Sequence, residues 1–190
     1  MAQHMAPQAK TLGMTIAGMI VVAMSMMSPG QRVAIAADAA LTATVLIEGV
    51  QGTQGDGSIP ILSFQAGITR SPSPGPAGSG GSTQPPQFSG VTITKVLDAT
   101  SPLLSLTAAM GKRIKTVELA FYDEAQHRYF EILLEDALIS SVQTIDGVVG
   151  TRPVEAVTFT FSRIVWTAFP TGAKSSPIVG GWDLRSNSAL

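Results

Sequence analysis

The sequence predicts a mainly β fold: one β-rich domain with a single short helix, preceded by an export signal. The chain of 190 residues suffices for one ordinary domain. From Thr42 onward, apolar residues recur mostly with a period of two, in short runs separated by Gly, Pro and Asp. One segment alone, near residues 101–111, carries helix start and stop signals.

Composition excludes several classes of function. Charged residues make up 13% of the chain, against about 25% in an average globular domain, so a monomer would have a surface poor in charge. Lys and Arg number 12 against 13 Asp and Glu, which provides no electrostatic footprint for nucleic acid or anionic lipid. The absence of Cys excludes disulfides, thiolate nucleophiles and Cys-ligated zinc.

The first segment has the layout of a signal peptide. Residues 11–27 are uncharged and mostly apolar, Lys10 precedes them, and Pro29-Gly30 follows. Ala34-Ile35-Ala36 then supplies the small-x-small pattern of a signal peptidase site, which predicts cleavage between Ala36 and Ala37, with Ala39 as second choice. The alternative is an uncleaved anchor, although this run is shorter than the roughly 20 residues of a spanning helix.

Cleavage there divides the chain into a signal peptide, 1–36, and a β-rich domain, 37–190. The mature chain would be mildly acidic, because Lys10 and Arg32 are removed and no acid is lost. We expect it in the periplasm or outside the cell, with no stable insertion in a membrane after cleavage.

The first half of the domain is expected to contain two strands and a long loop. Ala43–Glu48 is predicted to be a strand, Gly49–Gly57 a turn, and Ile59–Thr69 a second strand. Pro, Gly and Ser fill 13 of the 17 positions of residues 71–87, which leaves too little apolar surface to offset the entropy of ordering. Since two strands alone would be marginally stable, this segment is predicted to be a loop inside one domain.

A strand over Phe88–Leu97 precedes the predicted helix. Ser101 is the expected N-cap, Pro102 the first helical residue and Gly111 the left-handed C-cap. The helix has one mainly apolar stripe, predicted to cap one opening of a sheet or barrel, formed by Leu103, Leu106, Thr107 and Met110.

The second half is predicted to be a long hairpin followed by a long strand. The hairpin pairs Ile114–Tyr122, with Val117, Leu119 and Phe121 buried, with Tyr129–Ser140. The last long strand runs from Arg152-Pro153 to Trp166. Either of its parities, Val157 and Phe159 or Thr158 and Thr160, could face the core if a bulge lies near Arg163.

Catalytic templates fail for lack of residues. His127 is the only histidine beyond His4 and lies in a predicted turn, and no G-x-S-x-G motif is present. Glu131, Glu135 and Asp136 could form a carboxylate pair, but Glu131 and Glu135 share one parity, which favours a polar strand face. The sequence favours a non-enzyme without metal or cofactor; a secreted hydrolase built from His127 and carboxylates is the weak alternative.

The order of segments resembles the haemolysin-coregulated protein (Hcp) family of bacterial type VI secretion systems. The resemblance covers most of residues 43–185. Its pieces are Val45–Gly52, Ile61–Phe64, Ile93–Lys95, Ser101-Pro102, Gly111-Lys112 with Ile114, Leu138–Val142, Arg152–Glu155, Ile164–Thr167 and Gly181–Leu184. The positions that match the family motifs are Glu48, Gly49, Ser63, Phe64, Lys95, Ser101, Pro102, Gly111, Lys112, Ser140, Arg152, Pro153, Trp166, Trp182 and Asp183.

This resemblance implies a compact antiparallel β-barrel of two sheets with one short α-helix. It also implies homo-hexameric rings that stack into a tube, move inside a contractile sheath and carry small effector proteins, with a spike protein as a further partner. Segment 70–87 then matches the family's extended loop, used in contact between rings. Its candidate stacking residues are Arg70, Pro72, Pro74, Gly80, Gln84 and Gln87.

The predicted signal departs from this family, whose secretion members assemble in the cytoplasm without one. Either translation begins nearer Thr42, so that the protein is cytoplasmic before secretion, or the protein is an exported relative. An exported relative could still form rings, or act as a β-barrel binding module without a sheath.

Overall fold

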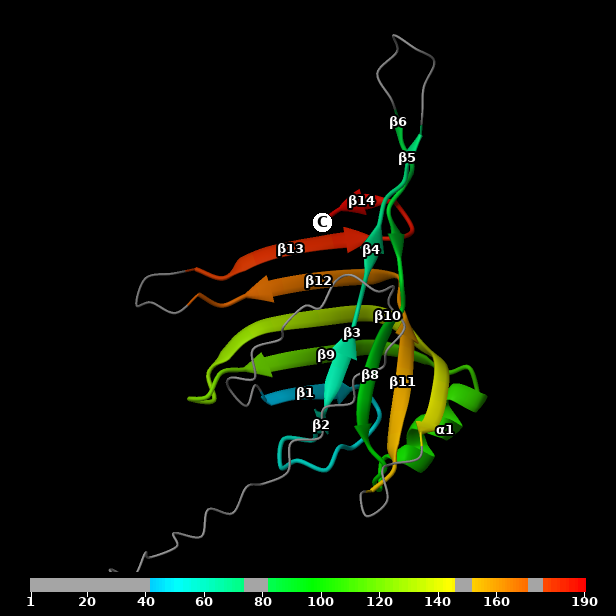
Figure 1. The fold of residues 1–190 in the computed structure, drawn as a ribbon, viewed down its shortest axis with the longest axis vertical. Coiled ribbons are helices and arrows are strands. Elements are labelled where there is room, and N and C mark those ends of the chain that lie inside the picture. Colours follow the sequence, from blue (N-terminus) through cyan, green and yellow to red (C-terminus); the bar gives the residue numbers. More distant parts are fainter. Residues whose placement is uncertain (1–41, 74–81, 146–151, 171–175) are drawn as a thin grey trace, which may run out of the picture. The chain divides into compact units, whose positions relative to one another are not determined.

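The fold is organised around one long strand, β10 (Arg128–Ile145), which belongs to two layers of antiparallel sheet (Figure 1). The computed structural model describes residues 42–73, 82–145, 152–170 and 176–190. All of them lie in one compact unit, Asp38–Leu190. The predicted signal peptide, with Ala34, Ala36 and Ala37, lies outside the described residues.

The described elements are mostly short strands. The other strands are β1 (Thr42–Ile47), β2 (Ile59–Ile61), β3 (Ser63–Gln65), β4 (Ile68–Thr69), β5 (Pro72–Ser73), β6 (Ser82–Thr83), β7 (Gln87–Phe88), β8 (Val91–Val96), β9 (Arg113–Tyr122), β11 (Val154–Thr160), β12 (Arg163–Ala168), β13 (Ile178–Asp183) and β14 (Ser188–Ala189). The helix is α1 (Ser101–Ala109). No described helix is long and apolar enough to cross a membrane.

The described strand pairings form one antiparallel path in two layers, which confirms the expected mainly β fold with one short helix. The first half of β10 pairs with β9, β9 with β1, and β1 with β2. The second half of β10 pairs with β11, β11 with β8, and β8 with β3. β2 and β3 are consecutive, and Leu62 between them donates its N–H to the Thr94 carbonyl at 2.7 Å. The bent β2–β3 segment therefore joins the two layers.

The predicted long strand from Arg152 to Trp166 is wrong, because it is two strands. β11 and β12 both pair with β10 and are separated by Phe161 and Ser162. The break lies beside the point where β10 bends: Asp136 has φ of +52°, and the N–H of Ser162 donates to the Glu135 carbonyl at 3.1 Å. Because β10 and the β11–β12 segment both bend at this point, β10 pairs with β11 in one layer and with β12 in the other.

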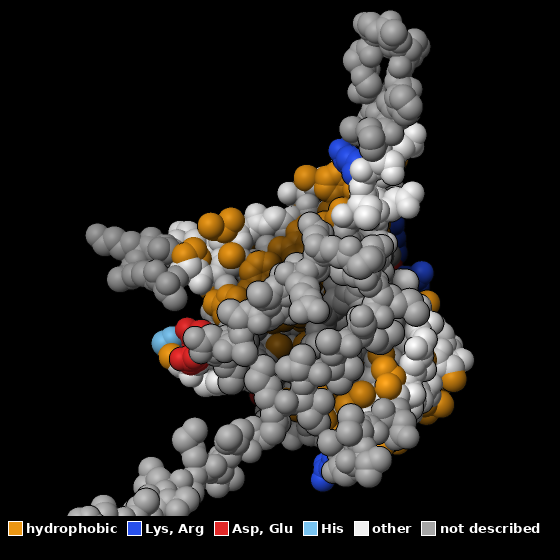
Figure 2. Space-filling view, in the orientation of Figure 1, with side chains coloured by type: hydrophobic (Ala, Val, Ile, Leu, Met, Phe, Trp, Pro, Cys, Tyr) orange, Lys and Arg blue, Asp and Glu red, His pale blue; other side chains and the backbone are white. Residues whose placement is uncertain are grey.

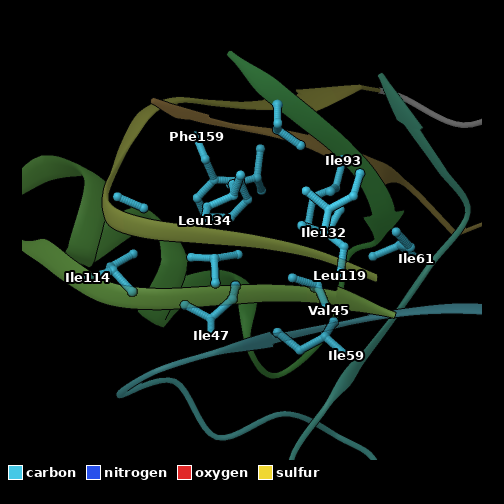
Figure 3. Close-up of a cluster of buried hydrophobic side chains, with 14 of the residues drawn as sticks. Val45, Ile47, Ile59, Ile61, Ile93, Ile114, Leu119, Ile132, Leu134 and Phe159 are labelled. Atoms are coloured by element: carbon cyan, nitrogen blue, oxygen red, sulfur yellow. The ribbon is translucent and has the colours of Figure 1, made fainter. Parts of the chain in front are cut away.

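The core lies between the two layers and consists of aliphatic side chains with a few aromatic ones (Figure 3). The structure buries Val157 and Phe159 and exposes Thr160, which settles the parity of β11. The predicted burial of Val117, Leu119 and Phe121 on β9 is confirmed. Each such side chain contributes about 1.5–3 kcal/mol relative to an exposed position.

The helix ends as predicted but begins differently. Gly111 has φ of +60°, its N–H donates to the Ala108 carbonyl, and the N–H of Lys112 donates to the Thr107 carbonyl, which is a Schellman cap. The expected N-cap is wrong: Thr100 holds that position, and Ser101 is already helical. The Ser101 hydroxyl is engaged instead by buried polar partners, described below.

The predicted direction of the apolar stripe of α1 is also wrong. Leu104 is the buried leucine of the helix, whereas Leu103, Leu106 and Met110 are 46%, 54% and 59% exposed. Their i, i+3, i+7 spacing does place them on one face, but that face points to solvent. Sequence periodicity identifies a common face without fixing which face the sheet covers.

Two strand expectations need adjustment. Residues 59–69 form three short strands, because β2, β3 and β4 pair with β1, β8 and β7 in turn. Residues 71–87 are not a structureless loop where they are described: β5 pairs with β6, next to the pair of β4 with β7. These two ladders form a narrow ribbon that extends away from the barrel (Figure 1), which we call the arm.

Candidate assembly surface

The arm is the first candidate surface, and backbone hydrogen bonds hold its described part. Gln84 donates its N–H to the Ser71 carbonyl at 3.1 Å, and Ser89 donates to the Gly67 carbonyl at 2.9 Å. Among the candidate stacking residues, Arg70, Gln84 and Gln87 are exposed, and Pro72 lies in β5. Pro74 and Gly80 lie outside the described residues. The arm thus presents polar side chains on a backbone stiffened by pairing.

Aromatic packing fixes the root of the arm to the sheet. Phe88 of β7 lies 6.2 Å from the ring of Phe161, edge to face, and 6.4 Å from the ring of Trp166. All three are partly buried against the core. Trp166, a family-motif position, therefore supports the arm, because such ring pairs stabilise beyond the area they bury.

A second candidate surface is the outer edge of β13. This strand pairs along its length with β12; on its other side β14 pairs with Trp182 and Asp183, and Leu190 donates its N–H to the Gly181 carbonyl at 3.1 Å. Among the described residues, no strand pairs with Ile178 and Val179 on that side. Ile178 and Val179 are 68% and 63% exposed, and Figure 2 shows hydrophobic side chains over this part of the sheet. An open strand edge with apolar side chains is a template for pairing with another chain.

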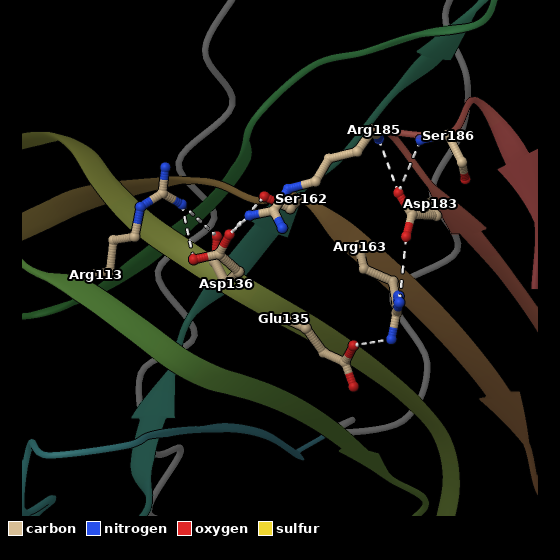
Figure 4. Close-up of polar contacts among 8 residues, drawn as sticks. All are labelled: Arg113, Glu135, Asp136, Ser162, Arg163, Asp183, Arg185 and Ser186. Carbon is tan, nitrogen blue, oxygen red and sulfur yellow. Dashed lines mark hydrogen bonds and ion pairs between the residues drawn. The ribbon is translucent and has the colours of Figure 1, made fainter.

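An ionic network holds the end of β13 against the bend of β10 (Figure 4). Arg163 donates to Glu135 at 2.8 Å and to Asp183 at 3.2 Å, and Asp183 also accepts the backbone N–H groups of Arg185 and Ser186. Those two backbone hydrogen bonds, with Arg163, hold the pKa of Asp183 below its usual value. Asp183, a family-motif position, thereby fixes the turn after β13.

Asp136 is the second acid of this network and sits at the bend itself. It accepts a hydrogen bond from the Ser162 hydroxyl at 2.8 Å and pairs with Arg113 at 2.7 Å and with Arg185. The Ser162 hydrogen bond and the Arg113 guanidinium lower the pKa of its carboxyl. Glu135 and Asp136, considered from the sequence as catalytic carboxylates, are thus engaged with arginines.

A buried polar network anchors α1 to the second layer. Lys95 and Glu155, which are cross-strand partners on β8 and β11, are 0% and 1% exposed and pair at 2.9 Å. The Ser101 hydroxyl donates to Glu155 at 2.7 Å and accepts the Asp98 N–H at 3.0 Å. Asp98 also pairs with Lys95 at 2.9 Å.

This network explains two family-motif positions and leaves one atom without a partner. Lys95 and Ser101 both contact Glu155 and so join strand β8 to the start of the helix. The second carboxylate oxygen of Glu155, Oε2, is buried and has no hydrogen-bond partner among the described residues. The geometry therefore favours a structural anchor whose charges depend on one another.

The remaining motif positions are structural or exposed. Phe64 packs on Phe121 with ring centres 4.7 Å apart, and Trp182 lies against the core. Gly49 and Gly111 adopt positive φ, at +84° and +60°. The others are exposed or partly exposed, namely Glu48, Ser63, Pro102, Lys112, Ser140, Arg152 and Pro153.

The residues considered from the sequence for catalysis or metal binding lie apart or are engaged in ion pairs. No group of three or more His, Asp or Glu side chains that could hold a metal ion occurs in the described part of the chain. The His127 side chain is 74% exposed in the turn before β10, as predicted. Glu131 pairs with Arg128 at 2.6 Å, in agreement with a polar strand face.

Sequence reasoning missed several of these contacts and residues. It considered Asp136 only as a catalytic carboxylate, and no local pattern links this residue to Arg113 and Arg185, which come from distant segments. Ile178 and Val179 were detectable as an apolar pair between Pro177 and Gly180-Gly181. Asp98 was detectable too, three residues after Lys95 and just before the helix.

Comparisons with known proteins agree on one family. The family model described as "Type VI secretion system effector, Hcp" matches residues 41–168. A Pseudomonas aeruginosa protein named "Major exported protein" is 33% identical over 96 residues, which cover 45% of this chain and 56% of that protein. "Protein hcp1" of the same organism is 31% identical over 104 residues, covering 51% and 64%. The matched segment thus spans less than two thirds of each of these relatives.

Solved structures share the fold. Hcp1 of Salmonella typhimurium superposes with a TM-score of 0.66 at 22% identity, covering 79% of this chain and 99% of its own. A structure described as a type six secretion system protein gives a TM-score of 0.72 at 22% identity, covering 80% and 100%.

Proposed function

Since this chain belongs to the Hcp family of the type VI secretion system, we propose that its copies close into hexameric rings and that the rings stack into a tube. The observation that supports ring closure is the open edge of β13, with exposed Ile178 and Val179. A neighbouring subunit that covers this edge would remove both the unpaired backbone and the apolar side chains from water. Charged residues make up only 13% of the chain, which agrees with a subunit that buries much of its surface against neighbouring subunits.

The arm supports stacking as a separate contact. It extends beyond the barrel (Figure 1) and exposes Arg70, Gln84 and Gln87. The exposed side chains of the arm are polar, as in the rims of non-obligate interfaces, and therefore suit a reversible contact between rings that have already formed. Small effector proteins in the lumen, a spike protein and a sheath are the further partners of this proposal, and no catalytic role is part of it.

The solution mass of residues 37–190, measured by light scattering with electron micrographs of the same fraction, tests ring closure. We expect a mass close to six subunits and annular particles. Ile178→Lys should abolish the ring, because it places a charge on the edge to be covered. Leu62→Lys is the matched control, since Leu62 is 60% exposed between β2 and β3, neither of which pairs with β13. A monomer at every concentration would contradict the ring and favour an exported binding module.

We also propose that residues 1–36 are removed as an export signal. The observations that support this are the apolar run 11–27, the Pro29-Gly30 break and the Ala34-x-Ala36 site. Expression of the full chain in a bacterium, followed by the intact mass of the protein outside the cytoplasm, tests it. We expect a chain that begins at Ala37, and Ala36→Tyr should block the cut. A chain that keeps residues 1–36, or is found only in the cytoplasm, would contradict export.

A further inference from the structure

Strand β14 occupies part of the same edge of β13 that we propose for ring closure. It pairs with Trp182 and Asp183, and Leu190 directly after it donates its N–H to the Gly181 carbonyl at 3.1 Å. Figure 1 draws β14 beside the outer edge of β13. We call β14 together with Leu190 the edge cap. The second half of the β13 edge is therefore already paired within the chain.

The outward-facing backbone groups of β13 are only partly used by the edge cap. In a strand, the N–H and C=O groups of every second residue point to the same side, so those of Val179 face outward like the carbonyl of Gly181. Among the described residues, none pairs with Val179 on that side. Because two strands cannot pair with the same backbone groups, a neighbouring subunit that pairs along all of β13 must displace the edge cap.

Specific contacts hold the edge cap in place. In the turn between β13 and β14, Asp183 accepts the backbone N–H groups of Arg185 and Ser186 at 2.8 and 3.2 Å. The Leu190 side chain lies over Gly181, where an added Cβ would come within 2.6 Å of Leu190 Cδ1. The absence of a side chain at Gly181 thus leaves the space that Leu190 fills.

The edge cap is nevertheless short and exposed. Both residues of β14 are exposed, and Leu190 is 60% exposed. Two paired residues and one further hydrogen bond make a weak ladder, since each backbone hydrogen bond contributes little net stability in water. A longer strand of another subunit can therefore displace it.

We propose that the edge cap is detachable and competes with a second copy of this chain for the edge of β13. While the cap is paired, a neighbouring subunit reaches only the part of the edge at Ile178–Gly180, which keeps association weak and reversible. When the cap is released, the whole edge becomes available and association tightens. This inference rests on the ring contact proposed at β13 and adds a control of its strength.

Two substitutions should loosen the edge cap without changing the charge. Gly181→Ala displaces the Leu190 side chain, whereas Gly180→Ala is its matched control, because nothing lies within 4 Å of the Cβ added there. Leu190→Pro removes the N–H that the Gly181 carbonyl accepts. Ala189→Pro is the matched control, because the N–H of Ala189 points away from β13 when that of Leu190 points toward it.

Light scattering at increasing concentration measures the association of protein purified after expression of the full chain, and circular dichroism verifies that each variant folds. We expect Gly181→Ala and Leu190→Pro to reach half-assembly at a concentration at least about tenfold lower than wild type, and both controls to match wild type. Adding Ile178→Lys to either loosened variant should abolish this gain. Hydrogen exchange of the Leu190 amide, which should be faster in Gly181→Ala than in wild type, verifies release of the cap.

Three outcomes would overturn the proposal. If wild type forms rings and the loosened variants associate no more tightly than their controls, ring closure stands and the competition is wrong. If the loosened variants associate less tightly, the edge cap belongs to the surface that the neighbour binds. If their gain survives Ile178→Lys, the contact lies at another edge.

A monomeric wild type would separate this inference from the proposed function. If wild type stays monomeric at every concentration, ring closure fails in the unmodified protein. The competition then stands only if the loosened variants associate and Ile178→Lys abolishes that association. If the loosened variants are also monomeric, the competition fails together with ring closure.

Discussion

Lys95 and Glu155 show how a motif position can be structural although it is charged. Both side chains are buried, and Glu155 Oε2 has no described partner, so the Glu155 carboxylate depends on Lys95 and the Ser101 hydroxyl, whereas Lys95 also pairs with Asp98. From the sequence, Lys95 and Glu155 both lie in segments that resemble the family, but their pairing across sixty residues could not be predicted. Only the register of β8 against β11, which places Lys95 opposite Glu155, shows the pair.

Replacing one member of this pair should be far more harmful than replacing both. Lys95→Met leaves the Glu155 carboxylate buried without its ammonium partner, and we expect the free energy of unfolding to fall by about 3–5 kcal/mol. The double variant Lys95→Met with Glu155→Leu should recover most of this loss. Urea unfolding of the single and double variants measures it. Single variants that cost less than about 1 kcal/mol would show that water reaches the pair.

Asp136 should make stability depend on acid pH. Its pKa in the folded protein is lowered by the Ser162 hydroxyl and by Arg113, so the unfolded chain binds the proton more readily. Its contribution is therefore present above the unfolded pKa, about 3.9, and is lost as pH falls through the folded pKa.

The comparison of wild type with Asp136→Asn measures this effect. The difference in unfolding free energy should be constant above about pH 5 and should shrink as the pH falls below about 4. Glu124→Gln, at an exposed turn position, is the control and should show no such trend. A difference between wild type and Asp136→Asn that grows toward acid pH would contradict the assigned hydrogen bonds.

At the scale of elements, the sequence predicted which segments form strands, but it predicted the ends of those strands less well. Strand β9 and its buried residues follow from alternation alone. The break between β11 and β12 was not predictable, because it is imposed by the bend of β10 at Asp136, a residue with no local turn signal. Likewise, the stripe on α1 was correctly identified as one face, yet the sheet covers the Leu104 side because the polar anchor of Ser101 and Glu155 sets the helix's rotation.

The turn between β1 and β2 depends on a close backbone contact at Gly52. Its N–H donates to the Gly57 carbonyl at 2.8 Å, and a Cβ added there would lie 2.2 Å from the Ser58 carbonyl oxygen. Because the obstruction is backbone, Gly52→Ala should cost about 1–3 kcal/mol, as overpacking does. Gly55→Ala is the matched control, since nothing lies within 4 Å of its added Cβ. Thermal unfolding measures both variants, and equal losses of stability in Gly52→Ala and Gly55→Ala would contradict this turn geometry.

At the scale of the whole molecule, the alternating pattern predicted a β-rich domain, but it could not show how the two layers are connected. That connection depends on one bent segment, β2–β3, whose halves pair with strands from different layers. The assembly surfaces were harder still to predict, because exposure of Ile178 and Val179 depends on β14 being too short to cover them. Family resemblance supplied the expectation of a ring, and the edge of β13 is where we propose that the contact between subunits lies.

Ring closure and stacking should be separable, because β13 and the arm are different elements. Ser71 and Gln84 are joined by a backbone hydrogen bond, so residues 72–83 can be replaced by Asn-Gly, which favours a tight turn. The β4–β7 ladder and the contact of Phe88 with Trp166 stay intact. We expect this variant to keep a hexameric mass by light scattering while stacked rings vanish from micrographs.

The complementary variant changes β13 and leaves the arm complete. Ile178→Lys should abolish the ring, and stacks should disappear with it because only rings can stack. If the shortened arm also abolishes rings, the arm contacts neighbours within a ring. If stacks survive the deletion, the rings stack through the faces of the barrel, and the arm must serve another contact.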